Sequence, residues 1–302
     1  MKRTSVKNFS VEYIGKHKVA YFFKSVWSLA NRDLKKWYLA PVLLIISLIQ
    51  PVVWLGLFGK AFNLAGIFTN SSFNIPGLNI PKSVLDTIGN TFLLNSFGTT
   101  SYFSFLAVGM LAFIVLFTAM FSGMSVVWDR RFGFLDKLLT TPVSRGSIVL
   151  GKIINSVVRA LVQALVVLII AIVLGMSVAN FTLVGVLDTF GALFLLAFGM
   201  SSLFVALGLR STDWQSQMAV ANLLSLPLLF MSNAFFPVSA MPSWLSAIAN
   251  VNPISFTIEI GRSALLGITP AVPFMYDFLY LGLFAAILGA ISIVLSWKLL
   301  KG

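Results

Sequence analysis

The sequence has no cysteine, a single histidine and few charged residues. The first two shortages each exclude a class of chemistry. Its 302 residues include no Cys and one His, and only 10% are Asp, Glu, Lys or Arg. Without Cys, disulfides, zinc–thiolate sites and thiol catalysis are excluded. With His17 as the one imidazole, the sequence cannot build a histidine metal cluster, a Ser–His pair or a zinc-protease motif.

One segment has the spacing of a phosphate-binding loop without its chemistry. Gly146, Gly151 and Lys152 follow the GxxxxGK spacing. However, Ile153 stands where a hydroxyl residue would ligate magnesium, and no strand is predicted before the segment. We interpret it as the start of a membrane helix, with Lys152 extending to the membrane surface. The predicted helices also lack the facing carboxylates of an intramembrane aspartyl protease, so we expect no catalytic, cofactor-binding or metal-binding residues and no enzyme activity.

Apolar residues make up most of the chain and predict an all-α membrane protein. They account for 58% of the sequence, and the mean hydropathy is +0.96, so a water-soluble globule would expose much of this surface. A bilayer core needs about 20 apolar residues per spanning helix. Uncharged runs of that length predict six spans, at about 39–59, 101–127, 148–175, 189–209, 214–236 and 278–297. Residues 39–302 would form this domain, and the polar, basic residues 1–38 a tail without a cleavable signal.

The basic residues predict how the protein sits in the membrane. If six spans alternate, one side carries most Lys and Arg, including nine before span one and five between spans two and three. The other side has only Lys60, Lys82 and Arg262. The positive-inside rule therefore predicts that both termini are cytoplasmic. The net charge of +12 then indicates topology and attraction to anionic membrane lipids rather than nucleic-acid binding.

Two segments next to the membrane have the pattern of amphipathic helices. Within 22–38, one predicted helical stripe is apolar: Phe23, Val26, Trp27, Ala30, Leu34 and Trp37. We expect this helix to lie in the membrane interface, as an anchor or a gating element. The segment 128–142 predicts a short helix stopped by a proline, with Phe132, Leu135, Leu138 and Leu139 on one face and Asp136, Lys137 and Thr140 pointing away. That apolar face fits either the membrane surface or a groove on a cytoplasmic partner.

The segment between spans five and six predicts two short helices. Its apolar pieces, 243–250 and 254–266, are too short to span and are separated by Asn and Pro. We interpret them as re-entrant helices that dip in from outside, since irregular backbone at membrane depth must be buried in protein or line water. Glu259 and Arg262 lie three residues apart on the second helix and suit a structural ion pair or a substrate contact.

A few polar residues lie inside the predicted spans. Arg159 is costly at its depth, so we expect it to face water or a counter-charge. Gln163 lies four residues later on the same face, and Asn222 lies in span five. These three side chains suit either the lining of a transport pathway or hydrogen bonds between helices.

Two loops carry dense motifs. After span two come Trp128-Asp129-Arg130, Gly133, Leu135 to Leu139, Thr141 to Arg145 and Gly151-Lys152; after span five come Phe236-Pro237, Met241-Pro242, Trp244-Leu245 and Asn252-Pro253. These residues resemble the corresponding segments of ABC-2 type permeases, the group that includes daunorubicin-type drug exporters and polysaccharide exporters. The resemblance departs from the family pattern at Arg131, where an acidic residue is common, and at Phe134, where a small hydroxyl residue is common.

The resemblance implies that 129–139 is a coupling helix which docks on a separate ABC ATPase subunit. The residues that would make this contact are Asp129, Arg130, Phe132, Leu135, Asp136, Leu138 and Leu139. ATP and magnesium would be bound by the ATPase subunit. The permease would form a homodimer, because one six-span half encloses little room for a substrate.

The predicted function is the transmembrane subunit of an ATP-driven exporter in the cell (plasma or inner) membrane. Its substrate would be amphipathic or hydrophobic: a drug, a lipid or a lipid-linked glycan. One alternative is an ion-coupled secondary transporter, which would normally show an internal repeat and acidic residues near the midplane. Another is a membrane-embedded lipid-modifying enzyme, which would need a nucleophile or a metal site.

Overall fold

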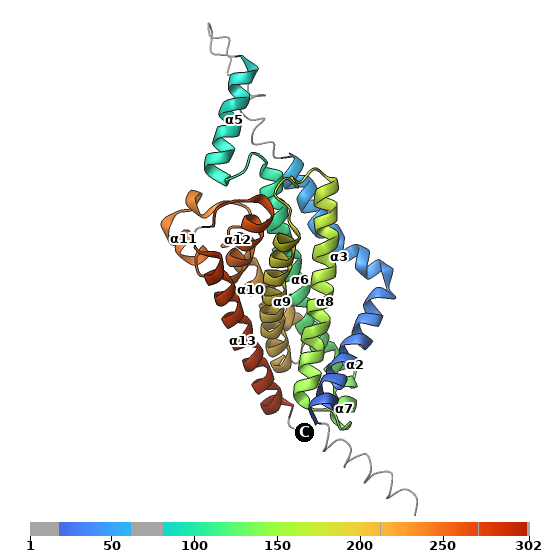
Figure 1. Ribbon diagram of the computed structural model, residues 1–302. Helices are drawn as coiled ribbons and strands as arrows, with labels where there is room; N and C mark the ends of the chain where they lie inside the picture. Colours follow the sequence, from blue (N-terminus) through green and yellow to red (C-terminus); the bar gives the residue numbers. More distant parts are fainter. Residues whose placement is uncertain (1–17, 62–80, 212, 271, 301–302) are drawn as a thin grey trace, which may run out of the picture.

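The chain folds as a bundle of helices. The computed structural model describes residues 18–61, 81–211, 213–270 and 272–300, and these contain no β-strand. The helices are α2 (Lys18–Tyr38), α3 (Pro41–Trp54), the π-helix η1 (Leu55–Ala61), α5 (Lys82–Phe97), α6 (Tyr102–Arg131), α7 (Phe134–Leu139), α8 (Arg145–Val173), α9 (Leu183–Arg210), α10 (Trp214–Phe230), the short 3₁₀ helix η2 (Val238–Ala240), α11 (Ser243–Ala249), α12 (Pro253–Leu266) and α13 (Phe274–Leu299). In Figure 1, α5, α11 and α12 lie at the upper end of the bundle, and α2 and α7 at the lower end.

Four helical segments are long and apolar enough to cross a membrane. They are Ser83–Arg131, Arg145–Val173, Leu183–Arg210 and Phe274–Leu299. They contain the whole of the predicted spans 101–127, 189–209 and 278–297. They also contain most of the predicted span 148–175. The predicted spans 39–59 and 214–236 correspond to shorter helices, each with an internal proline: α3 contains Pro51 and α10 contains Pro227. Crossing by these two segments stays a prediction.

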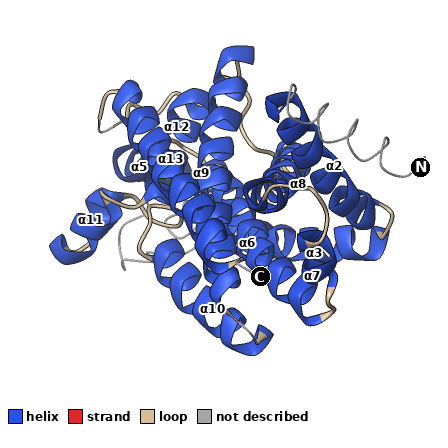
Figure 2. Cartoon of the chain, turned by 90° about the horizontal axis from the view of Figure 1, so that it is seen from below, coloured by secondary structure: helices blue, strands red, loops and turns tan. Residues whose placement is uncertain are grey.

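Helix α6 lies at the centre of the bundle. It begins at an N-cap, where the Ser101 side chain accepts a hydrogen bond from the backbone N–H of Ser104. From Tyr102 to Val127 nearly every residue is buried, and Figure 2 shows α8, α9 and α10 arranged around the helix. Its side chains form the largest apolar core together with those of α8 and α9. Helix α6 is therefore enclosed almost entirely by other helices of its own chain.

Glycines allow α6 and α9 to approach closely. A Cβ atom on Gly123 would meet the backbone carbonyl oxygen of Phe204, and one on Gly208 would lie 2.5 Å from the carbonyl oxygen of Gly123. Such small contact residues are typical of membrane helices, because they let two backbones pack against each other. The crossing of α6 and α9 thus depends on the absence of side chains at these two positions.

The predicted amphipathic helix of the N-terminal segment is present but is docked on the bundle. Helix α2 packs along α8, and its residues Val26, Ala30, Leu34 and Trp37 are buried. The remaining part of the predicted stripe turns outward, with the Phe23 side chain exposed. Helix packing therefore covers the inner part of the apolar stripe, and a position of α2 in the membrane interface stays a prediction.

The two short helices expected between spans five and six are present as α11 and α12. Helix α12 has Pro253 in its first turn and Asn252 as its N-cap, which accepts from the N–H of Ile254. It ends at Gly267, whose φ of 69° is the left-handed conformation that favours glycine. Its inner face is buried against α6, α9 and α13. Entry of these helices into the membrane stays a prediction.

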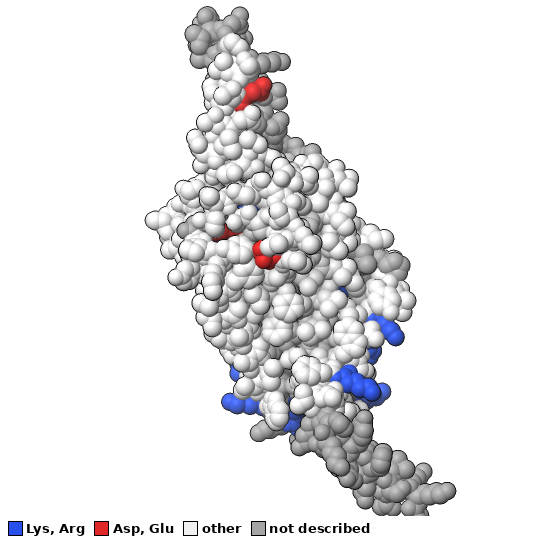
Figure 3. Space-filling model, viewed as in Figure 1, with Lys and Arg blue, Asp and Glu red and all other residues white. Residues whose placement is uncertain are grey.

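Charged side chains are unevenly distributed along the bundle. On the face seen in Figure 3, exposed Lys and Arg gather at the lower end, whereas the broad middle is almost free of charge. This pattern agrees with a membrane-embedded middle and a basic end. The lower end is the side that the charge rule assigns to the cytoplasm.

Candidate functional site

The predicted coupling helix is interrupted in the structure. Helix α6 continues to Arg131 and so includes Asp129 and Arg130, and α7 begins only at Phe134. Between them Gly133 has a φ of 66°, a left-handed conformation that ends a helix. The expectation of one helix over 129–139 is therefore wrong: the segment is the end of one helix, a glycine turn and a six-residue helix. The signal was present in the sequence as the glycine itself.

The bend divides the residues that were expected to share one apolar face. Leu135 is only 4% exposed, and Leu138 and Leu139 pack partly buried against the main core. By contrast, Phe132 is 78% exposed, and Asp136 is exposed on α7. The leucines therefore hold α7 on its own bundle, whereas Phe132 and Asp136 remain on the surface of the lower end.

Above α7, four charged side chains from three helices form a cluster, which we call the charge cluster: Arg32 and Asp33 of α2, Asp129 of α6 and Lys152 of α8. The Lys152 ammonium lies 2.8 Å from a carboxylate oxygen of Asp33 and also pairs with Asp129. Arg32 donates to Asp33 at 2.6 Å and lies 3.6 Å from Asp129. Two cations thus face two carboxylates, and α2, α6 and α8 are joined at this level.

Electrostatics at the charge cluster favour the ionised carboxylate of Asp33. Burial raises the pKa of Asp33, but attraction and hydrogen bonds from Lys152 and Arg32 outweigh burial and hold its pKa below the ordinary value. Lys152 itself is 6% exposed. The expectation that Lys152 extends to the membrane surface is therefore wrong, because two carboxylates hold it inside the protein.

Two further contacts join helices at the lower end: one between α6 and the end of α9, and one between α2 and α7. The Arg130 guanidinium donates to the backbone carbonyls of Leu209, at 2.7 Å, and Ser211, at 3.1 Å, and so caps the C-terminus of α9. The guanidinium carbon of Arg32 lies 3.9 Å from the ring centroid of Phe134, a cation–π contact between α2 and α7. Arg32 thus contacts both α7 and the charge cluster, and the cluster in turn joins α2 to α6 and, through Lys152, to α8.

The three expected pathway residues are not brought together. Gln163 of α8 is buried, accepts a hydrogen bond from Thr118 of α6 and donates one to Ser47 of α3. Arg159 lies one turn earlier with its guanidinium 5.4 Å from the ring centroid of Trp37. Asn222 lies on α10, which Figure 2 shows on the other side of α6 from α8. Gln163 therefore links helices, and a pathway role for these residues stays a prediction.

At the upper end, Arg262 of α12 is buried and joins separate parts of the chain. Its guanidinium donates to the backbone carbonyls of Phe105 and Ala234 and lies 3.3 Å from the ring centroid of Phe105. Glu259 lies half-buried on the same helix, three residues earlier. Backbone carbonyls of α6 and of the segment after α10 thus contribute to holding Arg262, which the sequence could not show. Within the described parts of the chain, no three His, Asp or Glu side chains meet as a metal site.

A family model described as "ABC-2 type transporter" matches residues 24–266. The chain belongs to the ABC-2 type transporter family. The matched range includes most of α2, the charge cluster, α7 and α12, and it ends before α13.

Several of the matched relatives are named as permeases. The transport permease ycf38 of Pyropia yezoensis is 31% identical over 256 residues, which cover 84% of this chain and 77% of that protein. The protein of the same name from Cyanophora paradoxa is 29% identical over 240 residues, or 79% of this chain and 73% of that one. The daunorubicin resistance ABC transporter permease protein DrrB1 of Streptomyces coeruleorubidus is 25% identical over 169 residues, or 56% of this chain and 59% of that one. The chain is thus a membrane transport permease of the ABC-2 family, whose members normally work with an ABC ATPase.

Proposed function

We propose that this chain is the permease subunit of an exporter driven by a separate ABC ATPase. The substrate would be an amphipathic or hydrophobic molecule such as a drug, a lipid or a lipid-linked glycan. The protein would be a homodimer in the cell membrane with both termini in the cytoplasm. ATP and magnesium would be bound on the ATPase, and the permease would supply the path across the membrane.

The observation that carries this proposal is the exposed side chain of Phe132 at the lower end, next to helix α7, which is packed on the bundle. Phe132 is a large apolar side chain left 78% exposed beside a helix that is itself anchored. Aromatic residues, Phe among them, are enriched at the buried centres of protein interfaces. Through Leu135 and the contact between Phe134 and Arg32, movement of α7 would be passed to the core and to α2.

Force would then reach the spans through the charge cluster. Lys152 is fixed to Asp33 of α2 and Asp129 of α6, so α8 cannot shift at this level without moving the other two helices. Closure of the ATPase subunits would press on Phe132 and α7 and rotate α2, α6 and α8 together. Rigid-body movement of packed helices is a common way to couple distant sites.

Co-purification tests the docking surface. An ABC ATPase subunit should be retained by tagged permease from native membranes, and Phe132→Ala should reduce its retention at least tenfold, as loss of an interface anchor does. ATP-driven transport in vesicles should fall in parallel. Phe23→Ala is the matched control, because Phe23 is also an exposed aromatic residue but lies on α2. Failure to recover any ATPase with wild-type permease, or full retention and transport by the Phe132 variant, would contradict the proposal.

A further inference from the structure

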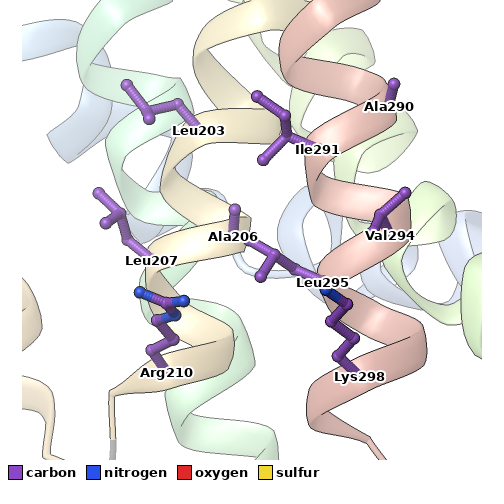
Figure 4. A pocket seen from close by; sticks show the side chains of 9 residues that line it. All are labelled: Leu203, Ala206, Leu207, Arg210, Ala290, Ile291, Val294, Leu295 and Lys298. Atoms are coloured by element: carbon purple, nitrogen blue, oxygen red, sulfur yellow. The ribbon is translucent and has the colours of Figure 1, made fainter.

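A groove on the bundle surface, between α9 and α13, is not used by the coupling mechanism. It has a volume of about 560 Å³ and begins at the lower end, where the two helices finish. Leu203 and Leu207 form one wall, and Ile291 and Val294 form the other. Figure 4 shows these aliphatic side chains along the groove.

The groove exists because the two helices carry small residues at this level. Higher in the bundle they pack tightly: a Cβ on Gly199 of α9 would meet the ring of Phe284 of α13. Lower down, Ala206 and Ala290 line the groove, and their methyl groups leave the space between the helices unfilled. The groove therefore follows from the small residues that α9 and α13 carry at this level.

Two basic side chains lie at the lower end of the groove. Arg210 is in the last turn of α9 and Lys298 in the last turn of α13. In Figure 4 both side chains extend upward into the groove from opposite sides. Neither forms an ion pair with an acidic residue in the parts of the chain that the structure describes. A cation near a helix C-terminus is common, but here two from neighbouring helices converge on one apolar groove.

This combination of shape and charge matches one class of ligand. Leu203 lies seven residues, or about 10 Å of helix, from Arg210, so the apolar wall has the length of the upper part of an acyl chain. The basic end lies on the side that the charge rule assigns to the cytoplasm, where the membrane surface is rich in anionic lipid. A molecule with an anionic head and a parallel apolar tail satisfies both parts.

We propose that the groove between α9 and α13 binds an anionic phospholipid of the cytoplasmic leaflet. The phosphate lies between Arg210 and Lys298, and one acyl chain lies along Leu203, Leu207 and Ile291. This proposal needs only that the bundle is embedded in a membrane with its lower end on the cytoplasmic side, so it stands apart from the assignment of ATP-driven export.

Native mass spectrometry of full-length permease, purified in mild detergent and mixed with defined lipids, tests the site. Wild-type protein should retain phosphatidylglycerol in preference to phosphatidylcholine. The double variant Arg210→Gln with Lys298→Gln should weaken phosphatidylglycerol binding about fivefold for each charge removed. Arg131→Gln is the matched control, because Arg131 is an exposed arginine in the last turn of α6 and does not line the groove.

A second variant separates shape from charge. Ala290 is exposed, so Ala290→Phe fills the groove with little risk to folding and should abolish most phosphatidylglycerol retention while both cations remain. Equal retention of the two lipids by wild-type protein, wild-type retention by the double variant, or an equal loss in the Arg131 variant would overturn the proposal. Efficient cross-linking between two copies carrying Ala290→Cys in membranes would overturn it too, because a second protein copy would then occupy the groove.

Discussion

A single ammonium group, that of Lys152, neutralises carboxylates contributed by two other helices. Asp33 lies 119 residues from it along the chain, so no spacing rule could have predicted the pair. Buried ion pairs contribute little net stability, but removing one partner is costly, and without Lys152 the two carboxylates of the charge cluster outnumber its remaining cation, Arg32. The residue is therefore far more important to the fold than its resemblance to the lysine of a phosphate loop would suggest.

The variant Lys152→Met should lower the free energy of unfolding by about 3–5 kcal/mol, the usual cost of removing one partner from a buried pair. Lys36→Met is the control: Lys36 also lies near Asp33, at 3.7 Å, but its side chain is 66% exposed, so the change should cost less than about 1 kcal/mol. Denaturant titration in detergent, followed by tryptophan fluorescence, measures both. Equal effects of the two variants would show that the charge cluster is not a structural element.

Acid should weaken the fold through Asp33. Because its folded pKa lies below the ordinary value of 3.8, its contribution to stability is present above that value and is lost as the pH falls through the lower, folded pKa. We therefore expect unfolding midpoints to drop at pH below about 3.8, and the variant Asp33→Asn to show a smaller drop. An identical acid dependence in the variant would exclude Asp33 as a source.

The contacts of a residue could be predicted where its type alone calls for a partner, but not where its partners come from segments far away in the sequence. The interhelical hydrogen bonds of Gln163 were among the alternatives, since a polar side chain inside a span normally finds a partner. The contacts of Arg262 with the carbonyls of Phe105 and Ala234 follow only from the packing of three chain segments. The three-residue spacing suggested Glu259 as a partner of Arg262, but it could not show that the carbonyl oxygens of Phe105 and Ala234 accept hydrogen bonds from Arg262.

At the scale of helices, the crossing of α6 and α9 is set by two glycines. Gly123→Ala and Gly208→Ala would each force a Cβ against backbone atoms of the facing helix, which cannot move as a flexible side chain would. Each change should lower the free energy of unfolding by about 1–3 kcal/mol, the typical cost of overpacking.

The matched control for this pair is Gly282→Ala in α13, because a Cβ there meets nothing within 4 Å. It should be neutral or slightly stabilising, since alanine favours a helix more than glycine does. Thermal unfolding in detergent compares the three variants. If the Gly123 and Gly208 variants are as stable as the Gly282 variant, the two helices are not in close contact.

Uncharged runs located most helices well, while breaks and docking were harder to predict. The ranges expected at 243–250 and 254–266 are close to α11 and α12, because Pro, Asn and Gly mark their ends locally. The stop at Gly133 was missed because the amphipathic pattern continues across it. Helix α5, of 16 residues, lies outside the six predicted spans because its sequence mixes apolar and polar residues. The docking of α2 was missed because an interface helix and a packed helix share one pattern.

At the scale of the whole molecule, the arrangement predicts which ends of the bundle face which compartment. Cysteine at position 83, at the exposed start of α5, should react with an impermeant thiol reagent added outside cells. Cysteine at position 140, just after α7, should react only after the membrane is opened. Both side chains are exposed, and the chain has no native Cys, so the background is clean. External labelling at position 140 would contradict the orientation.

The enclosure of α6 limits where two copies of this protein can touch. Nearly all of that helix from Tyr102 to Val127 is already covered by neighbours within one chain, so it has little surface to offer a second copy. An interface between two copies must therefore be formed by the helices that surround α6. A transport pathway along that interface would be lined by the same helices. Natural variants that alter cargo preference should therefore accumulate on the periphery, whereas changes along α6 should be visible mainly as poor insertion and low abundance.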